Sequence, residues 1–166
     1  MLLGQDGSVW AAGYNLYGQL GDGSYVNRNL FLRVITAASS GVVVAIAAGG
    51  FHSMVLKEDG SLLVTGSNEH GQLGDECNSK EFLPVISGEV TVIAAGGFHS
   101  MVVKEDGSVW ATGSNKYGQF GDGSTRSSKI FFEYDPFAHG EQRDLIPVHT
   151  SSRVRLINRA VIFSLL

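Results

Sequence analysis

Short apolar runs recur along this chain, and within each run the hydrophobic positions follow a period of two rather than the 3.6 of a helix. Residues 53–56 and 61–65, for example, are apolar runs of strand length separated by Lys57-Glu58-Asp59-Gly60. An Asp-Gly pair between two apolar runs predicts a tight β-hairpin, because glycine takes the positive φ of the turn at no steric cost. The same arrangement surrounds Asp6-Gly7 and Asp106-Gly107. Since no segment keeps a helical spacing of apolar residues, the pattern predicts an all-β fold.

The hairpins belong to a longer repeat. Residues 47–75 return as residues 94–122 with 22 of 29 positions identical, and part of the same unit occurs earlier, from Asp6 onward. Further strands are expected on both sides of each hairpin, over residues 42–47, 90–94, 30–35, 82–86 and 130–134. Four short antiparallel strands in a repeat of about 50 residues are typical of a β-propeller blade.

The repeat divides the chain into a propeller region, residues 1–134, and a divergent tail, residues 135–166, in which the pattern is lost. The propeller region separates into a partial first unit, a second unit and a third unit, over residues 1–46, 47–93 and 94–134. The tail is interpreted either as a capping strand or as a divergent, non-native segment. Met1 aligns with Met54 and Met101, inside the repeat, so a fragment of a longer propeller is favoured over a natural start at an internal methionine.

Three motifs recur in the same order: Gly-Gly-x-His-Ser, then Asp-Gly-Ser-Val-Trp, then Gly-x-Asn-x-x-Gly-Gln-Leu-Gly. In this order they resemble the repeat of the regulator of chromosome condensation family, whose known members are seven-bladed propellers. The resemblance implies about three four-stranded antiparallel blades of a seven-bladed architecture. It implies function less directly, because propellers of this family serve as exchange factors for small GTPases, as modules of ubiquitin ligases and as scaffolding surfaces.

Composition narrows the classes of function. A net charge of −4 with 43% hydrophobic and 17% charged residues excludes a disordered chain and gives no basic surface for direct binding of nucleic acid. The last seven residues are too short an apolar run to span a bilayer, so no membrane role is expected. A lone Cys77 allows no intrachain disulfide and favours a reducing compartment, the cytoplasm or nucleus.

Candidate chemistry is sparse. His52 and His99 could in principle bind a metal or act as acid and base, but no carboxylate or cysteine accompanies them at ligand spacing. They are interpreted as structural residues whose ring nitrogen pairs with a backbone group at the turn. The repeated asparagines and glutamines are interpreted as turn residues, and Trp10 and Trp110 as packing residues between blades. No catalytic residue, metal or cofactor is therefore expected, and the chain is not expected to be an enzyme.

We therefore expect a non-catalytic protein-interaction or regulatory propeller module. Its partner-binding positions are expected where the repeats differ at one fixed place, namely Glu69 and His70 in one unit against Lys116 and Tyr117 in the next. The alternative is guanine-nucleotide exchange on a Ran-like small GTPase. For that activity the resemblance implies a surface at Phe51, His52, Phe98 and His99, although Gly50 and Gly97 stand where an acid would be expected. About three blades also leave open edges, so self-association through these edges is expected.

Overall fold

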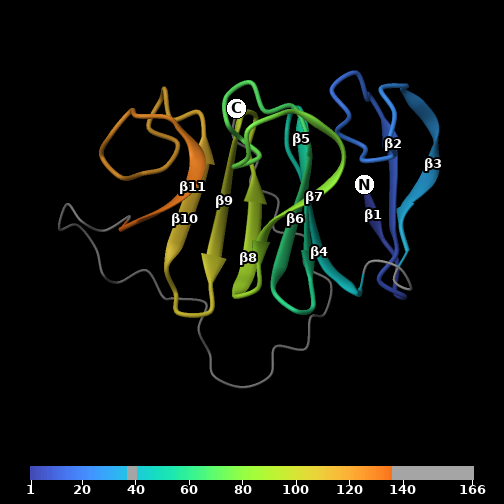
Figure 1. Cartoon of the computed structure of the whole chain (residues 1–166), viewed down its shortest axis with the longest axis horizontal. Helices are drawn as coiled ribbons and strands as arrows, with labels where there is room; N and C mark the ends of the chain where they lie inside the picture. The colour runs from blue at the N-terminus through green and yellow to red at the C-terminus, as the bar shows by residue number, and fades with distance from the viewer. Residues whose placement is uncertain (37–40, 136–166) are drawn as a thin grey trace.

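The computed structural model describes residues 1–36 and 41–135, and every regular element in them is a strand. The strands form three antiparallel sheets that stand side by side, as Figure 1 shows. This arrangement confirms the predicted all-β fold, an arc of propeller blades. The first sheet has three strands and the other two have four each. The divergent tail expected over residues 135–166 lies, apart from Asp135, outside the described residues.

Each sheet is one blade, with its strands in chain order across it. Blade 1 contains β1 (Leu2–Leu3), β2 (Val9–Gly13) and β3 (Arg28–Ile35). Blade 2 contains β4 (Val43–Ala48), β5 (His52–Lys57), β6 (Ser61–Gly66) and β7 (Ser79–Ser87). Blade 3 contains β8 (Val90–Ala95), β9 (His99–Lys104), β10 (Val109–Gly113) and β11 (Ser128–Tyr134). Each four-stranded blade thus includes the strand that precedes its Gly-Gly pair.

The Asp-Gly pairs lie at the hairpin tips, as predicted. Gly7, Gly60 and Gly107 have φ angles of 76°, 78° and 85°, the left-handed conformation that glycine adopts without strain. In blade 2 the amide of Gly60 donates to the carbonyl of Lys57 at 3.0 Å, and the Asp59 carboxylate accepts from the amide of Ser61 at 2.9 Å. We call this end of the blades the tip end.

The hydrophobic core lies between the blades, because successive residues of one strand point to opposite neighbours. Met54 belongs to the cluster between blades 2 and 3, together with Val102, whereas the next residue, Val55, packs with Val9 between blades 1 and 2. A strand of blade 2 is thus covered on both faces, which explains its continuous apolar run.

The two tryptophans differ from each other in their surroundings. Trp110 packs against the cluster between blades 2 and 3, and the Lys104 ammonium lies 4.1 Å from its ring centroid. Trp10 is 37% exposed, so the prediction that it packs between blades is wrong. The physical reason is its position on blade 1, where the described residues place no blade on the side opposite blade 2.

Candidate protein-interaction face

Opposite the tips, a turn joins the first two strands of blade 2 and another joins the first two strands of blade 3. We call the segments Gly49–Ser53 and Gly96–Ser100 the corners and this end of the blades the corner end. His52 is 1% exposed, and its Nε2 lies 2.8 Å from the hydroxyl of Ser100 on blade 3. The same hydroxyl donates to the carbonyl of Gln72 at 2.6 Å, which uses its only proton. His52 must therefore donate from Nε2, and its ring is an inter-blade link.

The prediction that the His52 ring pairs with a backbone group at its own turn is wrong. The ring pairs instead with a side-chain hydroxyl of the next blade. Burial, assisted by the nearby His99, lowers the pKa of His52 to about 4. Burial also lowers the pKa of His99. Both imidazoles are consequently neutral at pH 7, and the His52 ring is too deeply buried to touch a partner directly.

Three further hydroxyls repeat the connection between blades. Ser53 donates to the carbonyl of Gln19 at 2.7 Å, which is the counterpart of the bond from Ser100 to Gln72. Thr65 donates to the carbonyl of Gly18 at 2.9 Å, and Thr112 donates to the carbonyl of Gly71 at 2.7 Å. The loop carbonyls of blades 1 and 2 thus accept hydrogen bonds from hydroxyls of the following blade, which fixes neighbouring blades relative to each other at this end.

The loops that supply these carbonyls are built on the repeated asparagines, which are buried and have turn roles, as predicted. Asn15 accepts from the amide of Leu20 at 2.9 Å and donates to the carbonyl of Ser24 at 3.1 Å. Asn115 makes the corresponding bonds in blade 3, and Asn68 of blade 2 accepts from the amide of Leu73 and donates to the carbonyl of Asp75. A buried amide that satisfies both ends of a loop fixes the loop's shape, and the loop then presents its outermost residues to solvent.

Side chains at the outer surface of these loops and of the corners form an aromatic row across the corner end. Tyr17 of blade 1 meets Phe51 of blade 2 edge to face at 5.3 Å, Phe51 stacks on Phe98 of blade 3 at 5.2 Å, and His70 meets Phe98 at 4.7 Å. Tyr14 extends the row beyond Tyr17 with ring centroids 6.1 Å apart. All separations fall in the range of favourable aromatic pairs. We call these five side chains the aromatic row.

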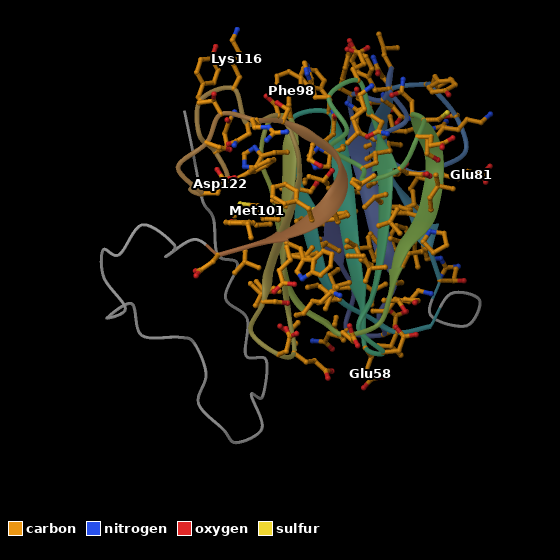
Figure 2. All side chains as sticks on the ribbon, turned by 60° about the vertical axis from the view of Figure 1, so that its left-hand side comes forward. Glu58, Glu81, Phe98, Met101, Lys116 and Asp122 are labelled. Carbon is orange, nitrogen blue, oxygen red and sulfur yellow. The ribbon has the colours of Figure 1, made fainter. Side chains whose placement is uncertain are left out.

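The structure brings together some of the residues singled out from the sequence. Phe51, His70 and Phe98 lie in the aromatic row, with Phe98 40% exposed. Glu69, Lys116 and Tyr117 are exposed beside it, and Figure 2 shows Phe98 and Lys116 at one end of the molecule, opposite Glu58 at the tip end. Tyr17 was missed, although it occupies the same repeat position as His70 and Tyr117 and could have been found from that alignment.

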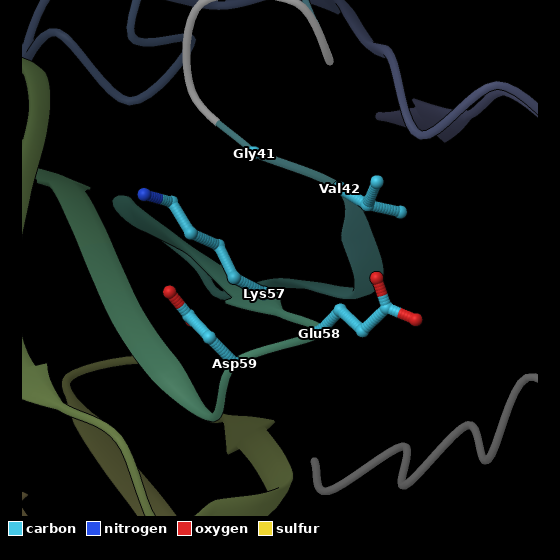
Figure 3. A pocket seen from close by; sticks show the side chains of 5 residues that line it. All are labelled: Gly41, Val42, Lys57, Glu58 and Asp59. Atoms are coloured by element: carbon cyan, nitrogen blue, oxygen red, sulfur yellow. The ribbon is translucent and has the colours of Figure 1, made fainter.

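The tip end has a different character. A hollow of about 300 Å³ at this end is lined by Gly41, Val42, Lys57, Glu58 and Asp59, whose arrangement is drawn in Figure 3. The Lys57 and Asp59 side chains extend to one side and the Glu58 side chain to the other, so polar groups do not converge as they do in a ligand site. Among the described residues no group of three or more His, Cys, Asp and Glu side chains could hold a metal ion. Within residues 1–36 and 41–135 no helix is long and apolar enough to cross a membrane.

Comparison with known proteins places these features in a family. The mouse X-linked retinitis pigmentosa GTPase regulator is 37% identical over 78 residues, which are 47% of this chain and 8% of that protein. Human Protein RCC2 is 39% identical over 74 residues, which are 45% of this chain and 14% of that protein. The chain therefore matches only a small part of the length of these relatives.

Solved structures agree on the fold. Human WBSCR16 superposes with a TM-score of 0.69 at 23% identity, over 79% of this chain and 34% of that one. Prp20p from Saccharomyces cerevisiae superposes with a TM-score of 0.68 at 22% identity, over 80% of this chain and 35% of that one. The profile of the regulator of chromosome condensation (RCC1) repeat matches residues 6–56 and 59–103, and a second profile of the repeat matches residues 43–72 and 90–119. With its blades, corners and repeat motifs, the chain belongs to the RCC1 repeat family.

Proposed function

We propose that this chain is a non-catalytic interaction module that binds a protein partner at its corner end. The observation that carries the proposal is the aromatic row, which runs unbroken from blade 1 to blade 3 at the surface. Aromatic side chains offer large contact areas at a small entropic cost and are enriched at the centres of protein interfaces. Phe51 and Phe98 would supply the centre of such an interface.

The residues beside the row would give the interface its selectivity. The same loop position carries Glu69-His70 in blade 2 and Lys116-Tyr117 in blade 3, so one scaffold presents opposite charges on neighbouring blades. Exposed charges at the rim of an interface favour a partner with complementary charges and reject others. The hydrogen bonds that hold the loops involve buried asparagines and backbone, so these exposed side chains can vary without cost to the fold.

The test is site-specific photo-crosslinking from the full chain. A photoreactive phenylalanine analogue at Phe98 should yield discrete crosslinked proteins in a cell extract, and the yield should fall when Phe51→Ala and His70→Ala are added. The matched control places the same analogue at Glu105, which is exposed at the tip end. Equal yields from Phe98 and Glu105, or no crosslinked protein from Phe98, would contradict the proposal.

Guanine-nucleotide exchange on a Ran-like small GTPase is the second candidate. It is supported by the shared fold with Prp20p, a protein whose binding to Gsp1p and histones has been studied. Burial of His52 argues that any such contact would use the rings of Phe51 and Phe98 rather than the two histidines. Release of labelled nucleotide from a Ran-type GTPase tests it: Phe98→Ala should slow release by more than its loss of stability, about 1 kcal/mol, explains. No acceleration by the wild-type chain would remove this candidate.

A further inference from the structure

The loop between β2 and β3 differs in chemistry from the matching loops of the other two blades. We call residues 14–27 the blade-1 loop, and Figure 1 shows it at the same end of the molecule as the loop between β10 and β11. Leu16, Tyr25 and Val26 of this loop are 56%, 50% and 58% exposed. We call these three side chains the apolar patch.

Blade 3 builds a loop of the same length from polar residues. In both blades a buried asparagine ties the two halves of the loop together. Asn15 donates to the carbonyls of Ser24 and Val26 at 3.1 and 3.2 Å, and Asn115 donates to the carbonyl of Ser124 at 3.1 Å. At the three positions of the patch blade 3 carries charged or hydroxyl side chains, namely Lys116, Thr125 and Arg126. The loop can therefore be built without an apolar patch, and folding alone does not explain it.

The hydrogen bonds of Asn15 also bring the patch residues together. Besides its two bonds to carbonyls, its backbone amide donates to the side-chain oxygen of Asn27 at 2.7 Å. Residues 24–27 are thus held beside residues 14–16, so Leu16, Tyr25 and Val26 belong to neighbouring backbone segments. A contiguous exposed apolar surface, unlike a single exposed side chain, marks an interaction site. Tyr14, at the end of the aromatic row, belongs to the same loop.

Neighbouring blades do not cover this surface. Blade 2 already packs against the blade-1 loop, because a Cβ added at Gly18 would lie 2.5 Å from the Cα of Lys80, and the Gly23 amide donates to the Lys80 carbonyl at 2.9 Å. Glu69, the counterpart of Leu16, is exposed although blade 2 has a blade on each side. Exposure at the position of Leu16 therefore belongs to the corner end and not to an open side of a blade.

Charge changes along the corner end beyond the patch. The only charged residue of the blade-1 loop, Asp22, accepts from Arg28 Nε at 2.7 Å and is thereby neutralised. The corresponding loop of blade 2, residues 67–78, has no lysine or arginine and exposes three carboxylates, those of Glu69, Asp75 and Glu76. Lys129 of blade 3 lies against this loop and offsets one of them. The surface is thus apolar on blade 1, negative on blade 2 and positive on blade 3, at Lys116 and Arg126.

We infer that the apolar patch anchors one end of a partner segment that is apolar at that end and basic at the other. The apolar end rests on the patch, and the basic end lies over the carboxylates of blade 2. Apolar burial holds the segment, and charge sets its direction, because Lys116 and Arg126 repel a basic end that extends to blade 3. The inference rests on the proposed function, since it takes the corner end as the binding surface.

An anionic lipid surface is the other occupant to weigh for an exposed apolar loop. Lys80, whose ammonium lies 5.7 Å from the centroid of the Tyr25 ring, would favour it. The carboxylates of the blade-2 loop would oppose it, because a surface that meets the patch also approaches the neighbouring loop and carries negative charge itself. The charge pattern therefore favours a protein segment.

The test uses the full chain and a labelled peptide with three leucines at one end, a Gly-Ser spacer and three lysines at the other. A photoreactive group in the leucine end should crosslink to residues 14–27, and one in the lysine end to residues 67–78, as mapped by mass spectrometry. Glutamates in place of the lysines should lower the yield about tenfold, since three surface ion pairs are replaced by repulsion. A reversed orientation, or a yield that ignores this change, would overturn the inference.

The decisive variant copies blade 3 onto blade 1 by combining Leu16→Lys, Tyr25→Thr and Val26→Arg. Its melting temperature should equal that of wild type, because blade 3 builds its loop with these residues, and its yield with the lysine peptide should fall at least about tenfold. Leu16→Ser alone, at an exposed position, should lower the yield about threefold. The matched control is Ile130→Ser, which removes a side chain 67% exposed on β11, outside the patch, and should leave the yield unchanged. Equal yields from wild type and the triple variant would overturn the inference.

Two further measurements separate this inference from the proposed function. A partner crosslinked from Phe98 in a cell extract with equal yield in wild type and the triple variant would keep the proposed function and overturn the inference. No crosslinked protein from Phe98 in wild type would contradict the proposed function itself. Cosedimentation with phosphatidylserine vesicles that the triple variant abolishes would make lipid the occupant of the patch and would also overturn the inference.

Discussion

We call the side of a blade that faces away from blade 1 its forward face, and the forward faces of blades 2 and 3 carry nearly the same residues in different surroundings. On blade 2 the histidine is linked to Ser100, and His70 rests against Phe98. On blade 3 the ring of His99 has no such link among the described residues, and Tyr117, the counterpart of His70, is 81% exposed. Because the two corner sequences are identical, the difference at the histidine comes from the neighbour and not from the choice of side chain.

This comparison changes how exposure is interpreted. A contiguous exposed apolar patch is evidence for a binding site, whereas a single exposed ring is not. Tyr117 lies on a blade that has no further blade beside it among the described residues. Phe98 is different, because it is 40% exposed although Phe51 and His70 already contact it. The central part of the aromatic row is therefore the stronger evidence for a partner, and Tyr117 the weaker.

The largest expected effect comes from adding one methyl group on each face. Gly71→Ala and Gly118→Ala impose the same left-handed backbone strain, about 1–2 kcal/mol, because φ is 85° and 76°. Only Gly71→Ala also forces the Cα of Lys129 away, from 2.5 Å, so we expect it to destabilise the fold by about 3–5 kcal/mol in total.

Chemical denaturation of the two variants measures the difference. The comparison predicts a gap of about 2 kcal/mol or more between their free energies of unfolding. Equal losses would mean that the faces of blades 2 and 3 are in similar surroundings, and the comparison would fail.

The second effect is a dependence of stability on pH. Folding lowers the pKa of His52 to about 4, whereas an unfolded histidine has a pKa of about 6.5. The unfolded chain therefore binds more protons in this window. The stability contributed by neutral His52 is fully present above pH 6.5 and is lost as pH falls toward 4, up to about 3 kcal/mol.

Melting temperatures from pH 7.5 to 4.5 test this, with His52→Gln as control. Glutamine can donate to Ser100 but does not titrate, so the variant should lose much of the pH dependence. Carboxylates titrate equally in both proteins, and an identical pH profile for the two would contradict a neutral, buried His52.

The third effect compares the histidines themselves. His52→Ala removes the bond to Ser100 and leaves a hole between blades, so we expect a loss of about 1–3 kcal/mol. His99→Ala removes a ring that touches Phe120, at 6.4 Å between centroids, but breaks no inter-blade bond among the described residues. Its loss should be below about 1 kcal/mol. Urea denaturation compares the two, and a larger loss for His99→Ala would reverse the assignment of the inter-blade link.

Much of the fold could be predicted from the sequence because its determinants are local. Asp-Gly turns and the alternation of apolar residues fix the hairpins, and the repeat then fixes where each blade begins again. The exposure of Trp10 could not be predicted, because it depends on which blades are neighbours. Repeat alignment treats Trp10 and Trp110 as equivalent, although only Trp110 has another blade behind it.

The candidate site could be predicted only in part, for a similar reason. Variation between repeats located Glu69, His70, Lys116 and Tyr117, since exposed loop tips tolerate change. The aromatic row joins residues more than 30 positions apart, such as Tyr17 and Phe51, whose contact depends on how blades stack. The hydroxyl partner of His52 was missed for the same reason, since Ser100 is 48 positions away in the chain.

The smallest expected effect on stability separates binding from folding. Lys116→Ala and Tyr117→Ala alter exposed side chains whose described contact is with each other, at 5.5 Å. Their free energies of unfolding should stay within about 0.5 kcal/mol of wild type. Phe98→Ala, in contrast, removes stacking on Phe51 and should cost about 1 kcal/mol.

The measurement uses a photoreactive phenylalanine analogue at Tyr14, at the far end of the aromatic row. The yield of crosslinked partner is then compared between the Lys116→Ala, Tyr117→Ala and Phe98→Ala variants. If the centre of the row makes the contact, Phe98→Ala should reduce that yield by more than its small loss of stability explains, while Tyr117→Ala should leave most of it. If the tip of the blade-3 loop makes the contact, the order reverses although Tyr117→Ala is the more stable protein. Because the two orders are opposite, one set of crosslinking and unfolding measurements decides whether the centre of the aromatic row or the tip of the blade-3 loop contacts the partner.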